Sequence, residues 1–588
     1  MSAQEKGPSQ ASQVVSLAKA GYTLVMSEDG RPYGVRRNGP NVALPLRGKA
    51  GLRSQLARQF VEANGGQVPS QSALADAMTV LEGVAGATDP VPVHLRVAGD
   101  SEQVVIDLGT ADGRCVVATP EGWSVQGRSP VLFRRSGAMS PMPTPEHTGA
   151  DGLALLRGLL NMDDGAFHQL VAWLVAAWIP HIPHPVLTFK GEQGTGKSKT
   201  AQMVINLVDP SAATKRSQPR DVKTWATQAF NSWALCLDNV STIAPWFSDT
   251  LCKAVTGDGI VDRALYTDDD VVVLTFRRVI AMTTIDAGAL AGDLAERLMM
   301  LELQVIPEDR RRTEEELDAA YDQARPAILA ALFDLLAAVL RELPSVHLER
   351  MPRMADFARV LATVDRVQGW NTLADYLKAS ESVAIEALEA DPFAAAVVAF
   401  VETHGAFSGT VSHLLTLLPP PETHTPKWPK TSANAGSLLR RFAPALRAAG
   451  IAFEEGRTLD RNRARCIWLT PSPEIARKSL SAPSALSASP ADLREPADSD
   501  SRVAVRTPSN RCPQTPIADS ESASADSDPK SLSAGNPSSH PVADSADAAD
   551  SDLRAISGYH LRCAACGQPI DPELTAAGHL THPDCAPN

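Results

Sequence analysis

The stretch VLTFKGEQGTGKSKT, residues 186–200, decides the fold of this chain. From Gly191 to Ser198 it fits the pattern G-x-x-x-x-G-K-[ST], with an apolar run before it and a helical pattern after it. Glycines let such a loop bend until its N–H groups face inward, and the helix that follows adds partial positive charge. The stretch therefore predicts a phosphate-binding loop between a buried strand and a helix, and a chance glycine-rich turn fits it poorly.

This loop predicts a binding site for ATP and Mg²⁺. Lys197 is expected to reach the β- and γ-phosphates, and the Ser198 hydroxyl is expected to bind the metal ion. The predicted ATP-binding residues are Gly191, Glu192, Gln193, Gly194, Thr195, Gly196, Lys197, Ser198 and Lys199.

A second apolar run, WALCLDNV at 233–240, ends on Asp238 and then gives Asn239. At the end of a strand, Asp238 is expected to hold Mg²⁺ directly or through a bound water. Many ATP-hydrolysing folds place a second acid beside such an aspartate, whereas this chain has an amide. Because a glutamine orients the attacking water in some GTPases, we expect slow hydrolysis with Asn239 in that role, helped by Thr284 or Glu192.

Two further residues are predicted to act on the nucleotide. The run RRVIAMTTID ends in Thr283 and Thr284, and Thr284 is expected to contact the γ-phosphate or the attacking water; an ordinary strand end is the alternative. Arg297 lies within DLAERLMMLEL and has two interpretations. It either pairs with Asp293 or Glu296, or serves as an arginine finger on a neighbouring subunit's nucleotide, where such a residue is worth ~10³–10⁵ in rate.

Composition and periodicity divide the rest of the chain. Strand and helix patterns alternate around the loop, which predicts an α/β P-loop core with a parallel sheet. In the helical region that follows, Thr313 and Glu316 have the spacing of a capping box, and Pro326 is expected to open a second helix. The predicted divisions are a disordered start (1–13), an α+β N-terminal domain of unknown role (14–135), a linker (136–150), the P-loop ATPase core (151–308), a helical region (309–390), a winged-helix-like unit (391–470), a disordered Ser/Ala/Asp/Pro linker (471–558) and a Cys/His module (559–588).

Residues 391–470 show three helical patterns followed by two strand patterns, with Ser432 or Asn434 as the cap of the third helix. This is the winged-helix arrangement, and its basic residues gather on the third helix and on the turn between the strands. Such residues suit phosphate contacts and groove entry, with a solvated face on a protein-docking module as the alternative. The predicted DNA contacts of this unit are Arg440, Arg441, Arg461 and Arg463.

The last thirty residues, counted from the boundary at 559, predict a structural Zn²⁺ site. Cysteine and histidine side chains at this spacing suit tetrahedral zinc, and four of them leave no open position for catalysis. A piece this short needs such a staple to fold, and an exposed reactive tail is the alternative. The predicted ligands are Cys563, Cys566, His582 and Cys585.

The composition sets limits on the class of protein. The 588 residues are 44% hydrophobic and carry a net charge of −13, which is globular and argues against a generally basic coat for nucleic acid, although a local basic groove is compatible with it. Eight cysteines without a disulfide framework indicate a reduced, intracellular protein. The N-terminus lacks the apolar core of a signal peptide, and no apolar run approaches the ~20 residues that span a bilayer, so we expect a cytoplasmic protein without a membrane segment.

Over residues 186–305 the order of these pieces resembles the AAA+ ATPases of the superfamily 3 helicase type, and also the primase–helicase-like ATP-binding proteins of phages, plasmids and other bacterial mobile elements. The resemblance rests on the P-loop, on CLDN, and on LCKAVTGDGIVDRALYTDDDVVV. It implies an AAA+-like sheet, a hexamer-type ring of identical chains, and a hairpin that grips single-stranded DNA in the ring channel. Carried over, Lys253, Arg263 and Tyr266 would face that DNA, and Asp268 to Asp270 would weaken the contact.

The sequence therefore favours an ATP-dependent DNA-binding motor of helicase type, with other replication proteins as partners, in the replication or maintenance of a mobile element. One alternative is an ATP-binding switch or scaffold without unwinding activity, which the missing second acid favours. Another is a transcription regulator that uses the winged helix to bind one duplex sequence. Stimulation of ATP turnover by single-stranded DNA separates the motor from the switch.

Overall fold

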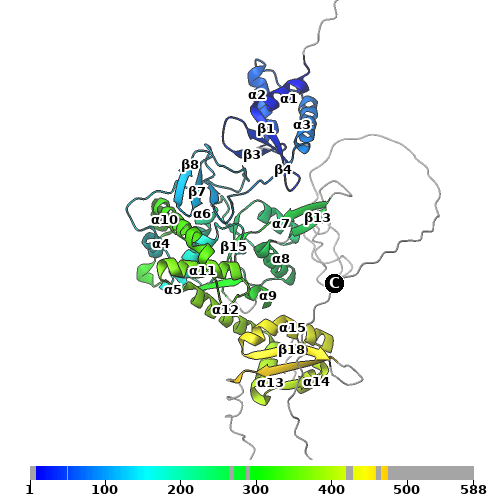
Figure 1. Ribbon diagram of the computed structural model, residues 1–588, viewed down its shortest axis with the longest axis vertical. Coiled ribbons are helices and arrows are strands. Elements are labelled where there is room, and N and C mark those ends of the chain that lie inside the picture. Colours follow the sequence, from blue (N-terminus) through cyan, green and yellow to red (C-terminus); the bar gives the residue numbers. More distant parts are fainter. Residues whose placement is uncertain are drawn as a thin grey trace, which may run out of the picture. The chain divides into compact units, whose positions relative to one another are not determined.

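The computed structural model describes residues 8–48, 51–257, 259–263, 271–285, 292–418, 428–457 and 465–473 (Figure 1). Among the described residues, no helix combines the length and the apolar character needed to cross a membrane. Several predictions concern parts of the chain outside these ranges. They are the Ser/Ala/Asp/Pro linker from residue 474 onward, the DNA contacts Tyr266, Arg461 and Arg463, and the zinc ligands Cys563, Cys566, His582 and Cys585.

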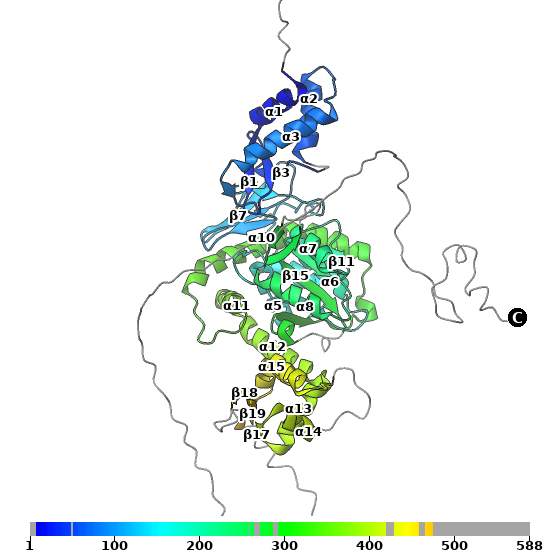
Figure 2. The same ribbon diagram turned by 90° about the vertical axis from the view of Figure 1, so that its right-hand side faces the viewer.

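A five-stranded parallel sheet lies at the centre of the fold, which confirms the predicted parallel α/β architecture (Figure 2). Its strand order is β11-β12-β15-β10-β16, so β15 lies between the strand that leads into the glycine-rich loop and the strand that leads into Asp238. The carboxyl ends of these three strands therefore meet at one edge. The strands are β10 (Val186–Lys190), β11 (Lys215–Arg216), β12 (Ala234–Leu237), β15 (Val279–Thr284) and β16 (Leu298–Glu302).

Helices surround this sheet and share one apolar core with it. The side chains of α5 are buried on nearly every face, as expected of a helix enclosed by the core. The helices of this unit are α4 (Gly152–Leu159), α5 (Asp164–Ala176), α6 (Lys197–Val208), α7 (Val222–Phe230), α8 (Pro245–Thr256), α9 (Gly292–Ala295), α10 (Glu314–Glu342), α11 (Ala355–Gln368) and α12 (Thr372–Glu389), with the antiparallel pair β13 (Gly259–Arg263) and β14 (Val271–Thr275).

The long helix α10 differs from the sequence expectation. The capping box of Thr313 and Glu316 is confirmed, but Pro326 lies inside a single 29-residue helix and does not open a second one. An internal proline costs about 3 kcal/mol. Buried apolar residues continue at helical spacing on both sides of it, Tyr321 and Ile328 among them, so packing outweighs that cost.

The N-terminal region begins earlier than predicted and is not one domain. Helix α1 starts at Gln10, capped by the Ser9 hydroxyl, so the expected disorder over 1–13 is wrong from Gln10 onward. A first unit packs three helices on the sheet β4-β1-β2-β3-β9 around its own apolar cluster. Its elements are α1 (Gln10–Gly21), β1 (Tyr22–Ser27), β2 (Pro32–Arg36), β3 (Val42–Pro45), α2 (Leu52–Ala63), α3 (Gln71–Gly86), β4 (Pro90–Val91) and β9 (Phe133–Arg134).

A second antiparallel sheet from the same region belongs to the central core. On its strands Val104, Ile106 and Val116 point into the core shared with α10, and the alternate residues Val105 and Val117 face a small separate cluster. The predicted domain 14–135 is therefore split between two apolar cores. The strands are β5 (Val97–Gly99), β6 (Val104–Asp107), β7 (Cys115–Thr119) and β8 (Gly122–Gln126).

The predicted linker at 136–150 is packed against the central unit. Met142 is only 2% exposed within the core, and Met139 pairs with Ser211 in an isolated bridge. His147 stacks on Trp123, and its ring nitrogen lies 2.9 Å from the Asp334 carboxylate. The proline-rich composition indicated a linker because prolines prevent regular structure, but it does not prevent burial.

Residues 391–471 build a third unit with its own apolar cluster. Its two long strands form the predicted hairpin, and a short strand that the sequence did not reveal, β17, extends it to the order β17-β19-β18. The third helix is capped by the Thr431 hydroxyl, so both predicted caps, Ser432 and Asn434, are wrong. The elements are α13 (Pro392–His404), β17 (Phe407–Gly409), α14 (Val411–Leu417), α15 (Ser432–Ala448), β18 (Ile451–Arg457) and β19 (Arg465–Pro471).

Candidate functional site

The glycine-rich loop joins β10 to α6 at the carboxyl edge of the sheet. Gly191 has a φ of 155°, and a Cβ there would lie 2.8 Å from the carbonyl oxygen of Leu303, so no larger residue fits. Gly196, at φ 82°, is the cap residue in front of α6 and turns the chain into the helix. The loop therefore ends at the amino terminus of a twelve-residue helix, where main-chain N–H groups lack helical partners.

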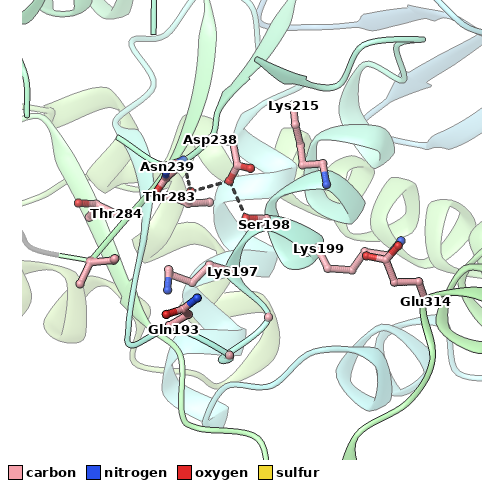
Figure 3. A pocket seen from close by; sticks show the side chains of 13 residues that line it. Gln193, Lys197, Ser198, Lys199, Lys215, Asp238, Asn239, Thr283, Thr284 and Glu314 are labelled. Atoms are coloured by element: carbon pink, nitrogen blue, oxygen red, sulfur yellow. Dashed lines mark hydrogen bonds between the residues drawn. The ribbon is translucent and has the colours of Figure 1, made fainter. Parts of the chain in front are cut away.

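Three elements meet at Asp238 in a continuous hydrogen-bond network (Figure 3). The hydroxyls of Ser198 and Thr283 each donate to Oδ1 of Asp238, at 2.7 Å in both cases. The main-chain N–H of Asn239 donates to the Thr283 hydroxyl at 2.8 Å. The first residues of α6, the end of β12 and the end of β15 are thus tied to one carboxylate.

A cavity of about 600 Å³ opens over this network. Of the predicted residues, Lys197, Asp238, Asn239 and Thr284 line it, as do the loop residues other than Gly191, Glu192 and Thr195. The sequence did not single out three residues of its wall. They are Lys215, Ile285 and Glu314.

These three residues had little local signal. Lys215 lies on β11, a strand of two residues, which is too short to show an alternating pattern. In the sequence, Glu314 indicates only the start of a helix. Its place at the cavity depends on how α10 packs beside the sheet. Charged residues reach this wall from segments that are far apart in the chain. The spacing of residues in the sequence does not show that such segments come together.

The cavity is more cationic than anionic. Its wall contains three lysines, Lys197, Lys199 and Lys215, against Asp238 and Glu314. Burial lowers the pKa of Lys197, while the neighbouring carboxylate of Asp238 acts in the opposite direction. A partly desolvated ammonium of this kind binds an anion more strongly than one in bulk water.

Two of these lysines already have protein partners. The Lys197 ammonium donates to the carbonyl oxygens of Gly191 at 2.7 Å and Glu192 at 2.6 Å. It therefore lies across the mouth of its own loop. Lys199 forms a 2.6 Å ion pair with Asp318 of α10.

The donor set at the network fits a magnesium ion. A hydroxyl and a carboxylate oxygen, from Ser198 and Asp238, are the hard ligands that Mg²⁺ uses when most of its shell is water and phosphate. Within the described ranges, no three His, Cys, Asp or Glu side chains gather into a metal-binding group.

A second cavity of about 1050 Å³ adjoins the first and shares Gly194 and Gly196 with it. Its wall combines apolar side chains, Met162 and Ile306 among them, with the basic run Arg310 to Arg312. Two residues of this wall are joined directly, since the side-chain amide of Asn161 donates to the carbonyl of Gln304.

Arg297 lies away from the cavity. It precedes Leu298, which pairs with Val186 at the amino ends of β16 and β10, so it is at the opposite edge of the sheet. Glu296, one of its two predicted partners, forms a 2.6 Å ion pair with Arg353. Within its own chain, Arg297 is therefore at the end of the strands opposite the cavity.

The predicted DNA residues within the described ranges are distributed over two units. Lys253 is exposed near the end of α8, and Arg263 ends β13. In α15, Arg440 lies 3.5 Å from Glu455 of β18, and the neighbouring Arg441 is exposed. Among the described residues, no contact joins Lys253 to Arg440 or Arg441.

The fold and the site define a class: a parallel α/β protein with a glycine-rich strand–loop–helix turn and a cationic cavity at the carboxyl edge of its sheet. Within that class the chain is similar to replication proteins of integrative conjugative elements. Residues 153–384 match the model of the actinomycete integrative conjugative element replication protein, and residues 393–485 match the AICE RepA C-terminal domain.

The solved structures that are similar to this chain share little of its sequence. No curated protein matches the chain. The apo C-terminal region of NrS-1 is similar at 11% identity, over 79% of this chain and 100% of that one, with a TM-score of 0.34. JCV helicase is similar at 12% identity, over 40% of this chain and 64% of that one, with a TM-score of 0.22.

Proposed function

We propose that this chain is an ATPase that acts on DNA during replication of a conjugative element. The observation that carries the proposal is the network of Ser198, Asp238 and Thr283 directly behind the glycine-rich loop. A loop that cradles phosphates works with a metal-holding oxygen pair at this place, and the cavity wall carries three lysines against two carboxylates. The similarity to replication proteins supplies the biological setting.

Each residue of the site has a distinct part in this proposal. Loop N–H groups and the α6 terminus bind the phosphates of ATP, and Lys197 exchanges its two carbonyl contacts for β- and γ-phosphate oxygens. Ser198 and Asp238 hold Mg²⁺, which neutralises charge that develops on the transferred phosphoryl group. The second cavity offers room for the nucleoside beyond the loop.

The decisive experiment measures ATP turnover of the intact chain with and without single-stranded DNA. Lys197→Ala is expected to lower turnover by at least about a hundredfold, because the cation in contact with the transferred phosphate is lost. Lys378→Ala, an exposed lysine of α12, serves as the matched control and should change nothing. Unchanged turnover in Lys197→Ala would disprove the site assignment.

Stimulation by single-stranded DNA, together with strand separation, would support the helicase-type motor with its ring of identical chains. The alternative is an ATP-binding switch, and the amide at Asn239 is the observation that favours it. Binding of ATP without stimulation by DNA and without unwinding would decide for the switch.

Two parts of the proposal concern other regions. The unit at 391–471 would bind DNA as a winged helix through Arg440 and Arg441, and salt-sensitive binding that weakens in an Arg441→Ala variant would support it.

The Cys/His module would hold one structural Zn²⁺. Metal analysis that finds no zinc in the native chain would exclude that site.

A further inference from the structure

The backbone of Asn239 has a conformation that few residues adopt. Its φ of 57° lies in the left-handed region, and no other non-glycine residue in the described ranges has a positive φ. Asparagine is several-fold enriched in this region, whereas alanine and glutamate meet a steric penalty there. The conformation therefore gives a reason for an amide at this position that does not involve the attacking water.

The left-handed turn wraps the chain around Thr283. The regular pairing of β12 with β15 stops at Leu237 and Met282. Beyond it, the Asn239 N–H donates to the Thr283 hydroxyl at 2.8 Å, and the Val240 N–H donates to the Thr283 carbonyl at 2.9 Å. The Val240 contact needs the turn at Asn239, because the φ and ψ of Asn239 set where the next N–H lies, and the two contacts together hold the side chain and the main chain of Thr283.

This clamp gives the Thr283 hydroxyl a fixed direction. Its oxygen accepts the Asn239 N–H, so its own proton is free to be donated onward, and it goes to Oδ1 of Asp238 at 2.7 Å. Such a chain of donors holds a carboxylate in one orientation better than a single contact does. Thr283 is only 2% exposed, which limits competition from water for these hydrogen bonds.

We propose that Asn239 is a positioning residue that acts through its main chain: its left-handed turn orients Thr283, and thereby Asp238, for the metal ion, and its side-chain amide takes no part in the chemistry. The inference rests on the proposed ATPase function. It replaces the expectation that the amide orients the attacking water.

The test compares Asn239→Gly with Asn239→Ala. Glycine adopts the left-handed conformation without strain but has no amide, whereas alanine lacks the amide and also resists the turn. For each chain, kcat is measured, and ADP affinity is measured by calorimetry with and without Mg²⁺. Thr283→Val, which removes the relaying hydroxyl, is the third variant, and thermal unfolding reports whether each variant is folded.

We expect Asn239→Gly to keep kcat within about twofold of the native chain and to keep the gain in ADP affinity that Mg²⁺ provides. Asn239→Ala and Thr283→Val should each lose about tenfold of that Mg²⁺-dependent gain, since the left-handed strain or the lost hydroxyl releases Asp238. Equal loss of kcat in the glycine and alanine variants, with the Mg²⁺-dependent gain intact, would show that the amide does chemistry and would overturn the inference. Native behaviour of Asn239→Ala in both measurements would overturn it as well. A native chain that binds no ADP and hydrolyses no ATP would instead refute the proposed function.

Discussion

At the residue scale, the site depends on which of two adjacent threonines faces Asp238. Both Thr283 and Thr284 are buried and both line the cavity, but the hydrogen bond to Asp238 comes from Thr283. Successive residues of a strand point to opposite faces, so the choice depends on the register of β15 beside β12. The sequence predicts that Thr284 contacts the γ-phosphate or the attacking water, and that stays a prediction; the contact of Thr283 with Asp238 appears only in the structure.

Lys215 is the residue at which nucleotide affinity can be tested without altering the network. It lines the cavity from β11, and its positive charge should attract the phosphates. We expect Lys215→Ala to raise the ATP concentration for half-maximal turnover about three- to tenfold, with a smaller change in kcat, since an exposed cation contributes about 1 kcal/mol. Steady-state kinetics measures both quantities.

The matched control is Lys223→Ala. Lys223 is an exposed lysine of α7 outside the cavity wall. An equal effect of the two substitutions would mean that net charge, and not the position of Lys215, sets the affinity.

At the element scale, a buried ion pair fixes the second N-terminal sheet to the central unit. Arg96, which precedes β5 and is fully buried, donates to Asp209 at 2.8 Å and to the carbonyls of Asp107 and Ser140. Asp209 caps the end of α6 and accepts the N–H groups of Trp233 and Ala234, where β12 begins. One carboxylate thus links the helix after the glycine-rich loop to the strand that leads into Asp238.

Removal of the arginine should therefore destabilise the whole central unit. Arg96→Met leaves Asp209 buried without its cation, and we expect the free energy of unfolding to fall by about 3–5 kcal/mol. The double variant Arg96→Met with Asp209→Asn should recover part of this loss. Chemical denaturation measures both.

An exposed pair provides the comparison. Arg58 and Glu62 lie 3.6 Å apart on α2 with most of both side chains exposed, so Arg58→Met should cost less than about 1 kcal/mol. A loss of similar size at Arg96 would mean that the buried pair contributes no more than a surface pair.

At the scale of the whole molecule, the position of Arg297 predicts sites shared between chains. In its own chain it lies at the edge of the sheet opposite the cavity. If it serves a neighbour's nucleotide, Lys197→Ala and Arg297→Ala chains are each inactive alone. An equimolar mixture should recover roughly a quarter of native turnover. In random assembly, about one interface in four combines an intact Lys197 from one chain with an intact Arg297 from its neighbour. ATP turnover of the mixture measures this. No recovery after mixing would assign Arg297 to a role within its own chain.

Local pattern determined the central architecture. The glycine-rich stretch at 186–198 and the apolar runs that end in Asp238 and Thr284 predicted a parallel sheet, since apolar spacing and loop chemistry are properties of short segments. Such segments also predicted the capping box at Thr313. Local pattern had limits even within a short segment, because α15 is capped by Thr431 and not by the predicted Ser432 or Asn434.

Only the tertiary structure decided what depends on contacts between distant segments. The strand order that sets β15 between β10 and β12, the split of region 14–135 between two cores, the continuity of α10 through Pro326 and the place of Lys215 at the cavity all belong to this group. The left-handed turn at Asn239 belongs there too: an amide in place of an acid suggested a changed chemistry, but the hydrogen bonds across to Thr283 give it a conformational reason. All of these features depend on burial and pairing with residues far along the chain, which a local pattern does not report, and at Pro326 packing also outweighed the local preference.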